Sequence, residues 1–195
     1  MKKQSGVTLV EVLVSMVIMA LGLVSLAALQ NYTLRYQLGS VHRAQLSGLL
    51  SDYAERVRSN LGQAPGEVAN SPYLVALSWD QQAAAVTAPA STTCAGGNAC
   101  APVALATADV AQWRDRVRRE LPRGSVHVTG DAVRGLSVTF MWSDKEFVEQ
   151  AGGDAREAPV CEELADSTGL AAQSCCPDAA DAPEGVRCAR FSLIP

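Results

Sequence analysis

The sequence predicts an α+β protein: a long N-terminal α-helix, membrane-spanning in its first half, packs on a small antiparallel β-sheet with disulfide-pinned loops. Three patterns indicate this fold class. A continuous apolar run opens the chain, an amphipathic helical pattern follows it, and strand-like alternation appears in two segments towards the C-terminus. The 195 residues suit one domain of ordinary size plus an N-terminal appendage.

The apolar run covers residues 7–29 and is long enough to span a bilayer. Its polar residues are Thr8, Glu11, Ser15 and Ser25, and two lysines, Lys2 and Lys3, precede it. An ionisable side chain near the centre of a spanning helix costs about 2.5 to 3.5 kcal/mol on insertion scales. Glu11 therefore requires a partner or a purpose.

The helical pattern continues beyond this run, to about residue 61. Half of the helix circumference collects nine apolar residues: Leu34, Leu38, Val41, Leu46, Leu49, Leu50, Tyr53, Val57 and Leu61. Four charged residues interrupt that half: Arg35, Arg43, Asp52 and Arg56. Gly62, Pro65 and Gly66 then end the helix. The pattern predicts an amphipathic continuation over residues 31–61 whose apolar face needs a sheet to cover it.

Residues 62–195 contain the elements of a globular α+β domain. The segment 107–121 predicts an amphipathic helix with Thr107 as its N-cap. The segment 125–144 predicts a hairpin with Gly130 and Asp131 in the turn, and residues 186–194 predict a further strand. In the hairpin, four apolar residues alternate with four others: Leu136, Val138, Phe140 and Trp142 with Ser137, Thr139, Met141 and Ser143.

Two long segments, 64–106 and 150–185, are rich in Ala, Gly, Pro and Asp. We expect irregular loops there, with too little apolar content to hold themselves in place.

Charge and cysteine usage indicate the compartment. Residues 1–61 hold six Lys/Arg against three Asp/Glu, whereas residues 62–195 hold ten against seventeen. An acidic globular part argues against a nucleic-acid partner. The six cysteines all lie beyond the apolar run, which is typical of disulfides formed in an oxidising compartment. Because basic residues tend to stay cytoplasmic, we expect the N-terminus inside and the bulk of the chain outside.

The cysteines predict structural disulfides. They are Cys94, Cys100, Cys161, Cys175, Cys176 and Cys188. We expect Cys94 and Cys100 to close one small loop. The adjacent cysteines 175 and 176 are expected to pair with the other two, in an order that the sequence leaves open.

The sequence predicts no metal centre, cofactor or catalytic site. The last four cysteines are an alternative zinc site, but they contain no C-x-x-C pair. Asp178, Asp181 and Glu184 lack the spacing of an EF-hand calcium loop. Neither histidine, His42 or His127, accompanies a nucleophile motif. A membrane-anchored periplasmic enzyme is therefore the weakest alternative.

Three explanations account for the opening stretch. In the first, it is a secretory signal peptide with a small-residue cleavage site at residues 25–27, so that the mature chain begins at Ala28. In the second, it is a plain single-span anchor that tolerates Glu11 near its cytoplasmic end. Neither explanation predicts the particular order of residues 6–11.

The third explanation is a resemblance. The stretch is similar to the leader and first helix of type IV pilins and pseudopilins, where a short basic leader ends in glycine and the fifth residue after it is glutamate. The matching positions are Lys2, Lys3, Gly6 and Glu11, and Val7 replaces the phenylalanine that is common after the cut. The resemblance implies a pilin fold and a prepilin peptidase that cuts between Gly6 and Val7 and methylates the new amine. It also implies that Glu11 meets the amine of Val7 of an adjacent subunit.

On this resemblance, residues 1–6 are a leader, 7–30 a transmembrane and filament-core helix, 31–61 its amphipathic continuation, and 62–195 a periplasmic globular domain. The order of elements is most similar to the minor pilins of the PilV group, the type IV pilus modification proteins. This implies a structural subunit, not an enzyme, of the inner membrane and then of an extracellular pilus of the kind used in twitching motility. The implied partners are other major and minor pilins and the prepilin peptidase. A minor pseudopilin of type II secretion is the alternative.

Overall fold

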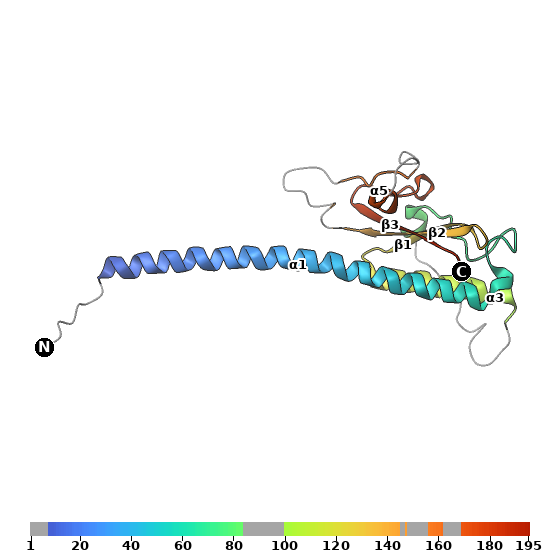
Figure 1. Cartoon of the computed structure of the whole chain (residues 1–195), viewed down its shortest axis with the longest axis horizontal. Coiled ribbons are helices and arrows are strands. Elements are labelled where there is room, and N and C mark those ends of the chain that lie inside the picture. The colour runs from blue at the N-terminus through green and yellow to red at the C-terminus, as the bar shows by residue number, and fades with distance from the viewer. Residues whose placement is uncertain (1–7, 84–99, 145–146, 148–155, 162–168) are drawn as a thin grey trace. The chain divides into compact units, whose positions relative to one another are not determined.

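The computed structural model describes residues 8–83, 100–144, 147, 156–161 and 169–195. The chain divides into two compact units, Met1–Ala44 and Gln45–Pro195, and each is described by itself. Figure 1 shows the long helix α1 and, in the second unit, shorter helices and a three-stranded sheet. The predicted α+β fold class is confirmed.

Helix α1 (Leu9–Ser59) is 51 residues long. The predicted start at Val7 lies outside the described residues. At its other end, a 3-10 turn, η1 (Leu61–Gln63), follows the helix, and Gly66 then adopts a left-handed φ of 98°. The helix therefore ends where glycine and proline predicted it.

The part of α1 in the first unit presents its side chains to the surroundings. Over Leu9–Leu34, 26 residues, every side chain is exposed. Among the described residues, this is the one helix that is long and apolar enough to cross a membrane. A signal sequence near the N-terminus would meet the same criterion of length and composition.

The end of α1 belongs to the core of the second unit. Its fully buried residues recur every three or four positions: Leu46, Leu49, Tyr53 and Val57. Among the stripe residues whose side chains the structure describes, burial is confined to this part, because Leu34, Val41 and Leu61 are 59%, 50% and 53% exposed.

Helix α3 (Pro102–Glu120) lies alongside the end of α1 (Figure 1). The predicted N-cap at Thr107 is wrong, since the helix begins five residues earlier with a proline. Proline suits the first position of a helix because a backbone N–H there would have no partner within the helix, and proline has none to pair. The Thr107 hydroxyl instead donates to Val103 O inside the helix, at 2.8 Å. Trp113 is fully buried and donates its Nε1 proton to Leu49 O at 2.9 Å, which joins the two helices.

The sheet is antiparallel, in the order β1–β2–β3. The strands are β1 (Ser125–Asp131), β2 (Gly135–Ser143) and β3 (Val186–Leu193). The predicted hairpin and the C-terminal strand are both present, but the turn lies further along the chain. Gly130 sits within β1 opposite Leu136, and residues 132–134 form the turn. Asp131 Oδ1 supports it by accepting bonds from the N–H groups of Val133 and Arg134, at 3.0 and 2.6 Å.

Both faces of the sheet are buried. One face, with Val126 and Phe140, packs in a single core with α1 and α3. On the other face, Met141 and Cys188 pack in a second cluster with Trp79. The alternation in β2 is as predicted, yet Thr139 and Met141 are not on a solvated face, because this second cluster and the surrounding chain cover them.

The segments predicted as loops contain short elements and core residues. The elements are α2 (Trp79–Ala83), α5 (Leu170–Gln173) and η2 (Asp178–Ala180). Tyr73 and Val75 are buried in the main core, and Val75 exchanges backbone hydrogen bonds of 3.2 and 2.9 Å with Val128. The expectation of little apolar content is therefore wrong for the first of these segments.

Candidate functional site

The first candidate site is the N-terminal end of α1, where Thr8 and Glu11 form a capping box. The backbone N–H and the hydroxyl of Thr8 donate to Glu11 Oε2, at 2.9 and 3.0 Å. In return, the backbone N–H of Glu11 donates to Thr8 Oγ1 at 3.4 Å. This reciprocal arrangement satisfies N–H groups at the helix end that have no partner within the helix. Gly6 and Val7, the predicted cleavage residues, lie outside the described residues.

The capping box gives Glu11 a role within its own chain. A negative charge in the first turn of a helix is favoured by the helix dipole. Both bonds from Thr8 end on one carboxylate oxygen, and a carboxylate offers about four lone-pair sites. Glu11 can therefore cap its own helix and still accept a cation from another chain.

Thr8 is the functional residue that sequence reasoning missed. The pattern T-x-x-E directly before an apolar helical run is the sequence signature of a capping box. An acid in an apolar helix is costly, and this cost suggests a partner on another chain. The structure shows that Glu11 also has a partner in its own chain, Thr8, three residues away.

Hydroxyl groups further along the apolar helix also bond within it. Ser15 Oγ donates to Glu11 O at 2.8 Å, and Ser25 Oγ donates to Leu21 O at 2.9 Å. Polar groups in an apolar medium need such internal partners. These serines are therefore compatible with a bilayer.

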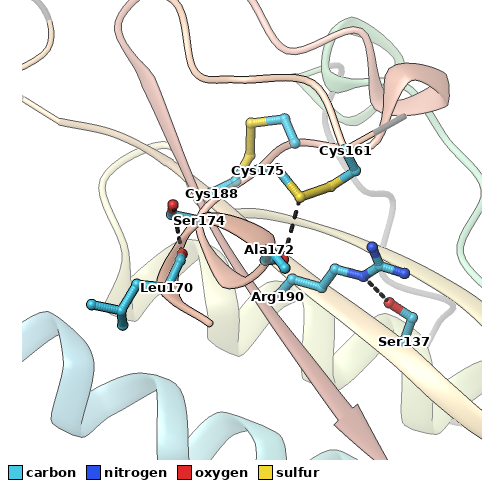
Figure 2. Close-up of a disulfide and its surroundings, with 9 residues drawn as sticks. Ser137, Cys161, Leu170, Ala172, Ser174, Cys175, Cys188 and Arg190 are labelled. Carbon is cyan, nitrogen blue, oxygen red and sulfur yellow. Dashed lines mark hydrogen bonds between the residues drawn. A yellow bond between two sulfur atoms is a disulfide. The ribbon is translucent and has the colours of Figure 1, made fainter. Parts of the chain in front are cut away.

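The second candidate site is the group of disulfides in the second unit. Bonds join Cys161 to Cys175 and Cys176 to Cys188, with Cα–Cα distances of 4.9 and 5.3 Å. The structure thus supplies the order that the sequence left open. Figure 2 shows the Cys161–Cys175 bond. Cys100 is also disulfide-bonded, and Cys94, its expected partner, lies outside the described residues.

Backbone contacts reinforce these two bonds. The N–H of Cys161 donates to Cys176 O at 2.9 Å, and the N–H of Cys176 donates to Pro159 O at 2.8 Å. Because Cys188 belongs to β3, the Cys176–Cys188 bond links the chain around Cys176 to the sheet. On the sheet itself, Figure 2 shows Arg190 Nε donating to Ser137 Oγ, at 2.7 Å.

The candidate metal ligands do not come together in the part of the chain that the structure describes. Four of the cysteines are oxidised, so they offer no thiolates to the alternative zinc site. Within the described ranges, no group of three or more His, Cys, Asp or Glu converges on one point. His42 lies half-buried in the first unit and His127 lies buried in β1 of the second. The acidic residues that lack the spacing of a calcium loop are exposed: Asp178, Asp181 and Glu184.

A polar network joins α1 to α3 in the second unit. Asp52 accepts bonds from Arg56 Nε at 2.9 Å and from Arg116 at 3.1 Å. Arg56 also contacts Asp109 at 3.2 Å. The Tyr73 hydroxyl lies 3.0 Å from Asp109 Oδ2, and burial, followed by the Asp109 charge, raises the pKa of Tyr73 to about 12. Asp52 and Arg56 therefore interrupt the predicted apolar stripe because they face α3.

Comparison with known proteins bears on the first site. Residues 1–27 match the family model described as the prokaryotic N-terminal methylation motif. No curated protein and no solved structure matches the chain. The matched residues include Gly6, Val7, Thr8 and Glu11. Together with the α+β fold, the motif supports a type IV pilin-like protein, that is, a pilin or a pseudopilin.

Proposed function

We propose that the chain is a minor pilin subunit of a type IV pilus, held in the inner membrane by α1 until it enters the filament. The observation that carries the proposal is the methylation motif at residues 1–27, which leads into a helix whose apolar side chains are exposed. A soluble protein would cover so large an apolar surface. The cover here comes first from lipid and later from the helices of other subunits.

Cleavage after Gly6 would create a cationic amine on Val7, next to the capping residue Thr8. In an assembled filament this amine and the Glu11 carboxylate are each costly alone and tolerable as a pair. The capping box supports this role, because it holds Glu11 at the helix end while leaving lone pairs for the amine of an adjacent subunit.

The disulfides support a location of the second unit outside the cytoplasm. Bonds such as Cys161–Cys175 and Cys176–Cys188 form and persist in oxidising compartments, of which the bacterial periplasm is one. With α1 in the inner membrane, the second unit would be periplasmic before assembly and would lie on the pilus afterwards.

Three variants test the role of Glu11, each expressed in a strain that lacks the native gene. Glu11→Ala removes the charge and the side-chain acceptor for Thr8, and Glu11→Gln keeps an acceptor for Thr8 but removes the charge. Thr8→Val removes the hydroxyl but keeps the charge. The measurements are inner-membrane content, leader removal and incorporation into sheared pili.

We expect all three variants to insert in the membrane and to lose the leader. Loss of one partner of a buried ion pair costs about 3 to 5 kcal/mol, so incorporation of both Glu11 variants should fall more than about a hundredfold. Thr8→Val should assemble, since it keeps the ion pair. Normal incorporation of Glu11→Ala and Glu11→Gln would show that the acid is merely tolerated, as in a plain anchor.

A pseudopilin carries the same motif, so a deletion of the gene separates the two systems. We expect surface pili to fail and type II secretion to continue. The reverse result would assign the chain to the secretion system.

A further inference from the structure

A small pocket lies in the second unit, where α2, the C-terminal end of α3 and the start of β1 meet. Its lining residues are Trp79, Gln82, Arg118, Arg123, Gly124 and Ser125. The cavity volume is about 50 Å³. A water molecule occupies about 30 Å³ of liquid, and pockets for drug-sized ligands run from about 300 to 1,000 Å³. The pocket therefore suits one small polar group.

The connection between α3 and β1 places a guanidinium group at this pocket. Gly124 passes so close to the end of α3 that a Cβ there would come within 2.5 Å of Val117 O. The preceding residue, Arg123, adopts a left-handed φ of 53°, which is uncommon outside glycine and often marks ligand-binding sites. Its guanidinium carbon lies 5.6 Å from the centre of the Trp79 ring, within cation–π range. Trp79 is buried and so provides a fixed support for Arg123.

Ser125 contributes a polar atom that lacks a partner. Its side chain is 6% exposed, and its Oγ has no hydrogen-bond partner in the described part of the chain. The neighbouring Gln82 is fully engaged, since it bonds the N–H and the C=O of Val126 at 3.1 and 2.8 Å. A buried hydroxyl without a partner is unfavourable, and a ligand in the pocket would relieve it.

Positive charge gathers on the same side of α3. Arg114 and Arg118 are four residues apart and share a helix face. Burial and the charge of Arg118 lower the pKa of Arg114, whose Nε is buried without a hydrogen-bond partner among the described residues. Arg123, whose guanidinium lies over Trp79, brings positive charge to the pocket itself.

We propose that this pocket binds one carboxylate side chain of a neighbouring subunit in the filament. The Arg123 guanidinium supplies charge-assisted donors, and the Ser125 hydroxyl supplies another. The small volume admits the carboxylate but leaves the rest of the partner outside, which fits a side chain from an adjoining surface. This inference rests on the proposed function, because it requires that the chain joins a filament.

The first test measures incorporation of the full chain into sheared filaments, in a strain without the native gene. Arg123→Glu reverses the charge, and Ser125→Ala removes only a hydroxyl. Arg119→Gln is the matched control, because Arg119 is exposed on the same helix and contacts Asp115. Tryptophan fluorescence and membrane content verify that each variant is folded and inserted.

We expect incorporation to fall about tenfold or more for Arg123→Glu, to fall measurably for Ser125→Ala, and to stay unchanged for the control. Wild-type levels for both pocket variants would overturn the inference while the proposed function stands. Absence of the wild-type chain from filaments would overturn the proposed function itself and, with it, the partner inferred here.

The second test identifies the ligand chemistry on the purified full chain in detergent micelles. Sodium acetate should raise the unfolding temperature of the second unit relative to sodium chloride at equal ionic strength, and Arg123→Glu should abolish the shift. No difference between the two salts would overturn carboxylate binding. An acetate effect combined with normal incorporation of Arg123→Glu would assign the pocket to a free small carboxylate and overturn the subunit contact.

Discussion

The disulfide between Cys176 and Cys188 should be a main source of stability for the second unit. The double substitution Cys176→Ala with Cys188→Ala opens a loop whose ends are 12 residues apart in sequence. Removal of Cys161–Cys175 opens a loop whose ends are 14 residues apart. For loops of these sizes, the chain-entropy model gives about 3 kcal/mol each at 25 °C. Cys175 and Cys176 are adjacent, and the N–H of Cys161 bonds to Cys176 O, so the loss on removal of both bonds should differ from the simple sum of about 6 kcal/mol.

All four cysteines are buried, but apolar packing makes the two bonds unequal. Cys176 and Cys188 pack with Met141 and Trp79 in the second cluster, so loss of their sulfur atoms also leaves a gap against the sheet. A gap the size of a methyl group costs about 1 kcal/mol. The variant without Cys176–Cys188 should therefore lose somewhat more stability than its matched control, the variant without Cys161–Cys175.

Urea unfolding of the full chain in detergent micelles measures both effects. All three tryptophans lie in the second unit, so their fluorescence reports its unfolding: Trp79, Trp113 and Trp142. For a domain of about 150 residues, a loss of 3 kcal/mol lowers the unfolding temperature by about 6 to 12 °C. A loss below about 1 kcal/mol for both variants would refute the view that these bonds hold the loops.

Further predictions concern the contacts between α1 and the rest of the second unit. The pKa of Tyr73 is about 12 in the folded chain and about 10 when unfolded, so the folded state holds the proton more tightly. The contribution of this proton to the free energy of unfolding should be fully present below about pH 10 and be lost between about pH 10 and 12. Tyr73→Phe should therefore reduce the fall in stability over that pH range. An unchanged profile would contradict the buried contact with Asp109. Leu49→Ala should cost about 2 to 5 kcal/mol in urea unfolding, whereas the exposed Leu61→Ala should change stability by less than about 0.5 kcal/mol. Equal losses would contradict the burial pattern of α1.

Periodicity predicted the elements of the fold better than their surroundings. The helix over residues 9–59 and the strands of the sheet follow from spacing that is local in the sequence. The burial of Thr139 and Met141 does not, because the residues that cover them, such as Trp79, are distant along the chain. The early start of α3 depends on a proline within a segment whose composition otherwise indicates a loop.

The candidate site was predictable in part for similar reasons. Glu11 stands out because an acid in an apolar helix is costly wherever it lies. The order of the disulfides was not predictable, since adjacent Cys175 and Cys176 give both possible pairings nearly the same sequence separations. Only the three-dimensional path of the chain decides between them.

The mass of the mature chain, purified from membranes and from sheared filaments, tests the central claim most directly. Removal of six residues from the 195 leaves 189, and we predict a chain of that length that begins at N-methylated Val7. Gly6→Val should keep its leader, because a bulky side chain at the cut blocks the peptidase. A wild-type chain that begins at Ala28, or one that retains Met1 and its leader, would contradict the account.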